Sequence, residues 1–547
     1  MPTTRRSKPR VLLWCAVLVV VVIAIVVCAY ALNRRCRGKF SKAAVAADSE
    51  KCSQIGRDML QRGGSAVDGA IAALLCTSLI NPQSMGLGGG ASSLLSIFCS
   101  LEGHSTVINS RETVPKVFKV DLLQDCPESF RPLTGPEWIG VPGELRGYEL
   151  AHRLYGKLPW ATLFEPTIKL AREGLRIQAV LDFHIVLKDS NPLYLAYVKL
   201  FSDAEGKPLK AGDIVKFKKL ADTLETIANE GAESFYSGQI AKDLISDIQL
   251  AGGTIMLEDL ASYKATLSDA WTFPLDDFQV HIAPPPAGGA ILAVVLNILK
   301  GLQKPTETYH LYIEAFKFAN GLRKHIGDPN FISDKLAKMF IKDDFADYVR
   351  SLIGNRTQDD KSYNLTSYLD SMGTTHVSVL AEDGSAVSAT STINHMFGSQ
   401  VFSPKTGIIL NNELADFCGR TKIHPGEQPP SSASPTVLKS QSKTLVIGSS
   451  GGSMITTGMA SALMNHLWFG EGLERAISSP VVFVNAQNLL RFEAKFNKDV
   501  IEGLKALGHK LEPKQGKLYN VVNAVEKDGE CICARSDTRK KGKAAGY

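Results

Sequence analysis

The sequence is poor in cysteine and, outside its first residues, lacks any excess of basic side chains. Ten cysteines in 547 residues are too few for a small scaffold held together by disulfide bonds. Residues 1–39 contain eight of the 61 lysines and arginines and no acidic residue, which leaves 53 basic against 55 acidic residues in the rest of the chain. A body that binds nucleic acid would concentrate basic residues, so we expect no nucleic-acid partner. With 44% hydrophobic residues, the chain has enough apolar material for a large folded core.

One long hydrophobic run is present, at residues 11–32, and it carries no charge. Its 22 residues are enough for a helix to cross a hydrocarbon layer about 30 Å thick. A cleavable signal peptide is the alternative, because Ala29-Tyr30-Ala31 has the form of a processing site, but the run is longer than the usual apolar segment of about 7–15 residues. We therefore predict a cytoplasmic tail at residues 1–10 and a signal-anchor transmembrane helix at residues 11–32. Four basic residues flank the run on each side, so charge does not orient it.

Two glycosylation sequons and a cysteine pair favour an extracellular location for the rest of the chain. Asn355 and Asn364 each begin an N-x-T sequon, and glycans there require that this part enters the secretory lumen. Cys52 and Cys76 flank a predicted helix that begins at Ser65 with an S-x-x-D capping box. A disulfide bond between them fits the same location. We predict a single-pass type II protein of the cell membrane with an extracellular catalytic body.

The order of predicted elements indicates a mixed α/β body. Residues 41–81 predict two helices joined by a hairpin or loop, and residues 158–350 predict mainly amphipathic helices. From residue 376, HVSVLAEDGSAVSATSTI contains two β-rich runs joined through Asp383-Gly384. Farther on, TLVIGSSGG and SMITTGMASALMNHLWFG predict a strand, a glycine turn and a helix. Layered sheets and helices follow from this order.

Two glycine-rich segments resemble known motifs. Residues 85–91 (MGLGGGA) lack the preceding strand of a dinucleotide-binding turn, so we expect a close-packed structural turn there. Residues 448–452 (GSSGG) fit the nucleophile elbow of a serine hydrolase, with Ser450 as nucleophile and Asp499 and His509 following in the right order. The late position of this nucleophile argues against that class, which stays open as an alternative. The glycine pair has a second possible use, because adjacent N–H groups at a helix start bind an oxyanion.

A third motif, Gly373-Thr374-Thr375-His376, lies directly before the predicted hairpin. A threonine hydroxyl needs an adjacent base to act as a nucleophile, and cleavage of the Gly373–Thr374 bond would supply one as a new α-amine. Gly373 would allow close approach of the hydroxyl and unusual backbone angles. Alone, the tetrapeptide also fits an ordinary strand start. If the hairpin loop is residues 382–384 with Gly384 left-handed, Thr392 falls opposite Thr374, whereas a two-residue loop shifts the register by one.

At this cluster the sequence resembles the gamma-glutamyltransferase (glutathione hydrolase) family of N-terminal-nucleophile hydrolases. The resemblance runs from the anchor to the final GKAAGY. It rests on AAVAADSEKCSQIGRDML, GGSAVDGAIAALLC, NSRETVP, VPGELRGYELAH, THVSVLAEDGSAVSATSTIN, GIILNNELADF, PPSSASPT, SSGGSMITT and LWFG. Within the family, HVSVL, SPKTGIILNNEL and ARSDTRKKGKAAGY are most similar to the branch that prefers leukotriene C4.

The resemblance implies an αββα sandwich made as one inactive chain that cleaves itself between Gly373 and Thr374. The products are a large subunit, residues 33–373 after the anchor, and a small catalytic subunit, residues 374–547, which form a heterodimer. Thr374 is implied to be the nucleophile of both self-cleavage and turnover, with its freed amine as the base. Neither a metal nor an organic cofactor is implied.

The resemblance also assigns roles to further residues of the site. The substrate α-carboxylate is implied to bind to Arg111, Ser431 and Ser432. The α-ammonium is implied to bind to Asn394, Glu413 and Asp416. Thr392 is implied to orient the nucleophile, and the oxyanion is implied to bind to Gly451 and Gly452. The implied reaction cleaves the γ-glutamyl amide of glutathione, or of conjugates such as leukotriene C4, and transfers the acyl group to water or to an amino acid or dipeptide. The alternatives are a serine esterase that uses Ser450 and a catalytically inert membrane glycoprotein.

Overall fold

A computed structural model describes residues 39–90, 97–98, 105–127, 131–178, 199–203, 205–301, 305–364, 373–513 and 520–547, with a few isolated positions elsewhere. The predicted tail at residues 1–10 and most of the predicted anchor at residues 11–32 lie outside this part of the chain. Among the helices of the described residues, none has both the length and the apolar character that crossing a membrane requires.

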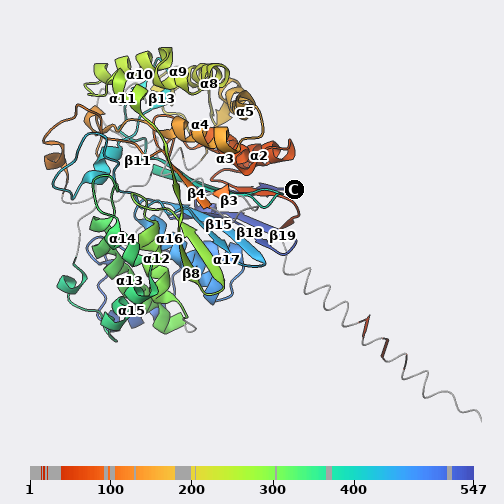
Figure 1. Cartoon of the computed structure of the whole chain (residues 1–547), viewed down its shortest axis with the longest axis vertical. Helices are drawn as coiled ribbons and strands as arrows, with labels where there is room; N and C mark the ends of the chain where they lie inside the picture. Colours follow the sequence, from red (N-terminus) through yellow and green to blue (C-terminus); the bar gives the residue numbers. More distant parts are fainter. Residues whose placement is uncertain are drawn as a thin grey trace, which may run out of the picture.

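Two antiparallel β-sheets lie face to face at the centre of the fold (Figure 1). The larger sheet has the strand order β1-β19-β18-β15-β14-β9-β8, and the smaller has the order β11-β10-β2-β20. Small apolar side chains from both sheets, including Ala44, Leu380 and Val446, fill the space between them. The larger sheet consists of β1 (Lys39–Phe40), β8 (Trp271–Leu275), β9 (Phe278–Ile282), β14 (Thr436–Lys439), β15 (Lys443–Ser450), β18 (Val521–Asp528) and β19 (Cys531–Ser536), and the smaller sheet of β2 (Ala44–Ala46), β10 (Gly373–Leu380), β11 (Ala386–Asn394) and β20 (Ala545–Gly546).

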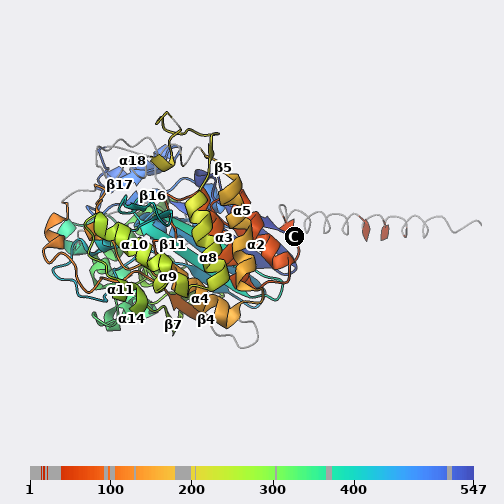
Figure 2. The same ribbon diagram turned by 90° about the horizontal axis from the view of Figure 1, so that it is seen from above.

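Helices cover the outer face of each sheet, which gives the predicted αββα order of layers (Figures 1 and 2). The group on the side of the smaller sheet comprises α2 (Glu50–Gln61), α3 (Ala66–Ile80), α4 (Glu144–Tyr155), α5 (Trp160–Glu173), α8 (Lys218–Glu230), α9 (Glu233–Tyr236), α10 (Gln239–Leu250) and α11 (Leu257–Ser262). The group on the side of the larger sheet comprises α12 (Gly289–Leu299), α13 (Pro305–Leu322), α14 (Lys335–Phe340), α15 (Asp343–Leu352), α16 (Met454–Leu463), α17 (Leu473–Ser478) and α18 (Lys498–Ala506).

Helix α3 begins at the predicted capping box. The Ser65 hydroxyl accepts a hydrogen bond from the Asp68 N–H at 3.2 Å, and the Asp68 carboxylate accepts one from the Ser65 N–H at 2.8 Å. All 15 residues of the helix are buried, because it lies between the smaller sheet and helices α2 and α5. A helix that is hydrophobic on every side is suited to such a position.

Residues 158–350 contain strands that the sequence analysis did not predict. Strands β8 and β9 pair with each other, and β9 joins the larger sheet by pairing with β14. Strand β7 (Thr266–Asp269) pairs with β4 (Ser105–Asn109). The prediction of mainly helices was therefore incomplete, because these strands have only four or five residues, and β7 and β9 pair with strands about 150 residues away.

Short elements complete the described part of the chain. Paired strands are β3 (Ile97–Phe98) with β4, β5 (Leu175–Arg176) with β6 (Ile214–Val215), β12 (Phe402–Ser403) with β13 (Ile408–Ile409), and β16 (Val482–Val484) with β17 (Leu490–Phe492). The 3-10 helices are η1 (Leu122–Asp125), η2 (Pro136–Trp138), η3 (Arg323–His325), η4 (Asp360–Tyr363), η5 (Glu413–Phe417) and η7 (Thr538–Lys540), and η6 (Met464–Trp468) is a turn of π-helix.

Within the described part of the chain, the disulfide bonds Cys52–Cys76 and Cys126–Cys418 connect elements around the smaller sheet and the site, and Cys531 is disulfide-bonded as well. The predicted bond between Cys52 and Cys76 is confirmed, with 5.3 Å between the Cα atoms. A second bond, Cys126–Cys418, was not predicted; it joins residues 292 positions apart, on opposite sides of the predicted cleavage point. Asn355 and Asn364 are both exposed, as a glycan requires, and their glycosylation stays a prediction.

Candidate active site

The hairpin of β10 and β11 places Thr374 beside Thr392. The Ala381 N–H donates to the Ser385 carbonyl at 2.9 Å, and Gly384 has a φ of +82°, so the loop has three residues with its glycine left-handed. Thr374 consequently pairs with Thr392 in the strand register. The three-residue loop is confirmed and the two-residue alternative is wrong.

The Thr392 hydroxyl connects both sides of the predicted scissile bond. It donates to the Gly373 carbonyl oxygen at 2.7 Å and accepts from the Thr374 hydroxyl at 3.2 Å and from the Asn394 N–H at 2.8 Å. Thr374 is 3% exposed and Thr392 5% exposed. A donor on the Gly373 carbonyl polarises the carbon that a Thr374 attack would reach, and it would stabilise the oxyanion formed there.

Gly373 is required by close packing rather than by its backbone angle. A Cβ at this position would lie 2.3 Å from the His395 carbonyl oxygen, and Gly373 is not among the glycines with a positive φ. His376, the last residue of the motif, is buried and bonded through Nδ1 to Thr390 and through Nε2 to Ser378, both at 2.9 Å. Burial lowers the pKa of His376 to about 3, so this imidazole stays neutral and structural.

A pocket at this end of the hairpin collects most of the predicted site residues. Those that line it are Arg111, Thr374, Thr392, Glu413, Asp416, Ser431, Ser432 and Gly452. They come from segments on both sides of the predicted cleavage point: Arg111 follows β4, whereas the others belong to residues 374–547. Asn394 lies directly behind the lining, because its N–H is bonded to the Thr392 hydroxyl.

Gly451 and Gly452 form the turn between β15 and α16, as the strand-turn-helix pattern predicted. Their φ angles are +124° and +60°, a region that residues with a side chain rarely adopt. Within the described part of the chain, neither N–H group donates to a protein acceptor. Because Gly452 lines the pocket beside Thr374, this turn is suited to bind an oxyanion.

Arg111 lies buried among three carboxylates. Its Nη1 is 2.9 Å from Glu413 and 3.8 Å from Glu112, and its Nη2 is 2.6 Å from Asp416. The predicted carboxylate anchor and two predicted ammonium anchors are therefore paired with one another. An amino-acid head group carries a carboxylate and an ammonium. On binding, its carboxylate would pair with Arg111 and its ammonium with Glu413 and Asp416, in place of the ion pairs within the protein.

The carboxylates of this cluster outnumber its guanidinium group. Burial raises the pKa of Glu112 to about 8 and also raises the pKa values of Glu413 and Asp416, although Arg111 opposes each shift. Nearby Glu144 has a pKa raised to about 7, chiefly by burial. These shifts favour protonated carboxyls, and a bound cation would favour their ionised forms.

Buried acceptors without donors mark where that cation would bind. Within the described residues, Asn394 Oδ1 and Glu413 Oε1 have no hydrogen-bond partner, while Asn394 Nδ2 donates to the Asn412 carbonyl at 3.1 Å and so fixes the orientation of the amide. Leaving such acceptors unpaired costs about 1–3 kcal/mol each. The N–H groups of an α-ammonium would satisfy them.

Arg323 is a pocket residue that the sequence analysis missed. Its Nη1 donates to the Ser432 hydroxyl at 2.7 Å, and its Nη2 donates to the Thr456 hydroxyl at 3.0 Å. Arg323 thereby holds Ser432 against the start of α16. Ser431 also lines the pocket, and its hydroxyl accepts a hydrogen bond from the Ala433 N–H at 3.1 Å. No motif around Arg323 distinguished it from other basic residues.

Lys540 and Asp48 form a second missed feature, a fully buried ion pair of 2.7 Å. The Lys540 ammonium also donates to the Thr374 carbonyl oxygen and, at 2.9 Å, to the Ser450 hydroxyl. Asp48 in turn accepts from the Thr375 hydroxyl at 2.6 Å. Lys540 thereby holds the backbone of Thr374 through its carbonyl oxygen. Both residues lie in segments that carry the family resemblance, but sequence does not reveal their contact.

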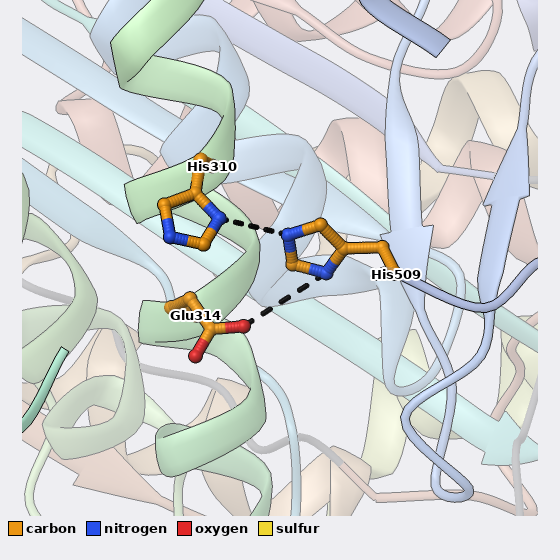
Figure 3. Close-up of side chains that lie close together, drawn as sticks. All are labelled: His310, Glu314 and His509. Atoms are coloured by element: carbon orange, nitrogen blue, oxygen red, sulfur yellow. Dashed lines mark hydrogen bonds and ion pairs between the residues drawn. The ribbon is translucent and has the colours of Figure 1, made fainter. Parts of the chain in front are cut away.

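The serine-hydrolase alternative requires His509 beside Ser450, and the structure separates them. His509 Nε2 is bonded to His310 Nδ1 at 2.8 Å, and its Nδ1 is 3.1 Å from Lys317 Nζ (Figure 3). Ser450 instead accepts from Lys540. Asp499 lies in the first turn of α18, where its N–H is bonded to the Asn497 side chain. The triad is not assembled.

His310, Glu314 and His509 together have the composition of a metal site, with ligand atoms within 4.8 Å of one another. Lys317 Nζ, however, lies 3.2 Å from Glu314 as well as next to His509. An ammonium therefore already neutralises this cluster, and the second histidine nitrogen of His310 is bonded to the Gly354 carbonyl at 2.9 Å. The cluster is a buried hydrogen-bonding network rather than a metal site.

Comparisons with known proteins agree with this geometry. The profile of the family described as Gamma-glutamyltranspeptidase matches residues 52–547. A mouse protein named glutathione hydrolase 5 proenzyme is 44% identical over 538 residues, and its human counterpart is 42% identical over 551 residues, with 93% of each chain covered in both cases.

Solved structures share the fold of the chain. Cephalosporin acylase from Bacillus halodurans shares the fold, with a TM-score of 0.83, 24% identity and coverage of 93% of this chain and 96% of the acylase. Gamma-glutamyltranspeptidase from Helicobacter pylori is 25% identical with a TM-score of 0.50, over 57% of this chain and 92% of its own. The chain is thus an enzyme with an α/β fold like that of the N-terminal-nucleophile hydrolases, and it belongs to the gamma-glutamyltranspeptidase family.

Proposed function

We propose that this enzyme cleaves its own chain at Gly373–Thr374 and then hydrolyses or transfers the γ-glutamyl group of glutathione and its conjugates through Thr374. The observation that carries the proposal is that the Thr374 hydroxyl, its partner Thr392 and the Arg111 cluster line one pocket. One small substrate could therefore bind the Arg111 cluster through an amino-acid head group and contact the Thr374 nucleophile at the same time.

Self-cleavage would begin with attack of Thr374 Oγ1 on the carbonyl carbon of Gly373. The Thr392 hydroxyl, already 2.7 Å from that carbonyl oxygen, stabilises the oxyanion. The hydroxyl proton moves to the Thr374 nitrogen as the C–N bond breaks, which leaves the Gly373 acyl group on Oγ1 as an ester and the nitrogen as a free amine. Water then hydrolyses the ester, so the large subunit ends in a carboxylate and Thr374 becomes the first residue of the small subunit.

Turnover repeats this chemistry on the γ-glutamyl amide. The Thr374 amine accepts the hydroxyl proton, the hydroxyl oxygen attacks the amide carbon, and the N–H groups of Gly451 and Gly452 stabilise the oxyanion. The amine then gives the proton to the leaving amino group, and a γ-glutamyl ester remains on Thr374. Water, or the amine of an amino acid or dipeptide, resolves the ester and regenerates the hydroxyl.

The α-carboxylate and α-ammonium of the γ-glutamyl group fit the two kinds of charge in the pocket. We assign the carboxylate to Arg111 with Ser431 and Ser432, and the ammonium to Asn394, Glu413 and Asp416. Leukotriene C4, which carries the same γ-glutamyl group, is included among the proposed donors because of the similarity to glutathione hydrolase 5. We further propose that residues 11–32 anchor the enzyme in the cell membrane with its body outside the cell.

The test is turnover of γ-glutamyl-p-nitroanilide by the purified wild type and by Thr374→Ala, Thr374→Ser and Ser450→Ala variants. We expect two chains on a reducing denaturing gel and activity in the wild type, loss of both in Thr374→Ala, and retention of both in Thr374→Ser and Ser450→Ala. Activity lost in Ser450→Ala but kept in Thr374→Ala would favour the serine esterase. A single inactive wild-type chain would favour the inert glycoprotein.

A further inference from the structure

The mouth of the active-site pocket is lined by cations, in contrast to its acidic interior. Arg323, Lys324 and Arg420 all line the pocket, and all three are partly exposed, whereas Arg111 is 1% exposed. Arg323 uses its guanidinium group to hold Ser432 and Thr456, so it belongs to the wall. Lys324 and Arg420 are the other two basic residues at the mouth of the pocket.

Neither of these two cations is neutralised by a neighbour. Among the described residues, no carboxylate forms an ion pair with Lys324 or Arg420. Glu427 acts on Arg420 only through space, and it forms its own ion pair with His424 at 3.0 Å. Lys324 and Arg420 are also close enough to His325 that both lower its pKa, in addition to the larger effect of burial. The mouth therefore concentrates positive charge.

The position of Arg420 is built into the chain. Its Nη2 donates to the Ile326 carbonyl at 2.6 Å, and a Cβ on Gly327 would lie 2.5 Å from the same nitrogen. A glycine at position 327 thus makes room for the guanidinium group at the pocket wall. The Cys126–Cys418 disulfide fixes the chain two residues before Arg420, and Cys418 and Gly419 line the pocket as well.

A donor of the glutathione type carries charge that matches this arrangement. Its γ-glutamyl head group has an ammonium and a carboxylate for the buried cluster around Arg111. Beyond the scissile amide, the cysteinylglycine portion ends in a second carboxylate. Thr374 and Gly452 also line the pocket, so a donor whose head group fills the buried cluster and whose scissile amide meets Thr374 directs its remaining part toward the mouth.

We propose that Lys324 and Arg420 bind the C-terminal carboxylate of the peptide that leaves the γ-glutamyl donor. This inference rests on the proposed function and adds a specificity-determining anion site to it. A guanidinium beside an ammonium is suited to a carboxylate, because Arg supplies paired donors in one plane and Lys a mobile point charge. Donors whose leaving group ends in a carboxylate, including glutathione and its S-conjugates, are then preferred over neutral ones.

The experiment compares glutathione with its glycine amide, γ-Glu-Cys-Gly-NH2, as donors for the wild type and for the Lys324→Gln/Arg420→Gln double variant. For each protein, the ratio of the two kcat/KM values is measured on one sample, so the fraction of folded enzyme cancels. A charge-assisted hydrogen bond is worth a factor of about 10–100, and we expect the wild type to prefer glutathione by about that factor. The double variant should reduce the preference to within about threefold of unity.

Arg62→Gln is the matched control, because Arg62 is an exposed arginine at the end of α2 and is absent from the pocket lining; it should keep the wild-type ratio. An unchanged preference in the double variant, or no preference in the wild type, would overturn the anion site while the hydrolysis of glutathione upheld the proposed function. If the wild type hydrolyses neither these donors nor γ-glutamyl-p-nitroanilide, the proposed function fails and the anion site falls with it.

Discussion

Replacement of Thr392 by valine removes the hydroxyl that contacts both partners of self-cleavage while it preserves the shape of the side chain. The variant loses the 2.7 Å hydrogen bond to the Gly373 carbonyl and the 3.2 Å contact with the Thr374 hydroxyl. Loss of one donor to a developing oxyanion costs about 2.7–4 kcal/mol of transition-state stabilisation, a factor of about 100–1,000 in rate. The variant also leaves the buried Asn394 N–H without its acceptor, which costs about 1–3 kcal/mol of folding stability.

Pulse–chase labelling in expressing cells, followed by reducing denaturing electrophoresis, measures the half-time of conversion from one chain to two. We expect Thr392→Val to lengthen this half-time at least 100-fold and Thr392→Ser to restore most of the rate. Thr390→Val is the control, because it removes a buried hydroxyl from the same strand that contacts His376 rather than Gly373; its half-time should stay near the wild-type value. A half-time for Thr392→Val within about threefold of wild type would refute the reasoning.

Three further predictions follow from the site and its surroundings. Arg111→Lys should raise the KM for γ-glutamyl donors at least about tenfold with a smaller change in kcat, because one ammonium cannot replace a guanidinium that spans two carboxylates; steady-state kinetics test this. Without a reductant, the Cys126–Cys418 bond should keep the cleaved wild type as one band on a denaturing gel. Because Cys531 is also disulfide-bonded, release of two bands should require Cys126→Ser together with Cys531→Ser. Glu144→Gln should raise the melting temperature relative to wild type progressively between about pH 4.5 and pH 7.

The sign of the Glu144 prediction follows from its pKa, which burial raises from 4.5 to about 7. Between these pH values the folded wild type keeps a proton that the unfolded chain has released, so its stability falls as pH rises through this window. The glutamine variant carries no such proton, and the difference should reach the order of 3 kcal/mol above pH 7. A melting-temperature difference that does not change with pH would contradict this account.

The predictions for Arg111→Lys and for the Cys126–Cys418 bond can each be contradicted by a single result. An unchanged KM in Arg111→Lys would remove Arg111 from the binding of the head group. Two bands from the wild type without reductant would mean that the Cys126–Cys418 bond does not form in the mature enzyme.

Local features of the sequence predicted the part of the site that lies within one hairpin. Gly384 marks the loop, the loop length sets the register, and the register places Thr392 opposite Thr374. The same holds for the capping box of α3 and for the glycine turn after β15. In each case, the residues that interact lie close together in the chain, so spacing carries most of the information; for the hairpin, spacing left two registers open, and the structure decides between them.

Contacts between distant segments could not be predicted in this way. Asp48 and Lys540 are 492 residues apart and Cys126 and Cys418 are 292 apart, and only the tertiary fold brings them together. The pairing of Arg111 with Glu413 and Asp416 was missed for a related reason: the resemblance assigns each residue to a group of the substrate, and it does not reveal that buried opposite charges from distant segments pair with each other.

The most direct test of the central claim is the N-terminal sequence of the smaller chain, isolated after reduction from enzyme that turns over a γ-glutamyl donor. The account predicts that this chain begins Thr-Thr-His, with Thr374 first, and that the uncleaved precursor is inactive. Activity in a chain that is intact across residues 373 and 374, or a mature terminus at another residue, would contradict it.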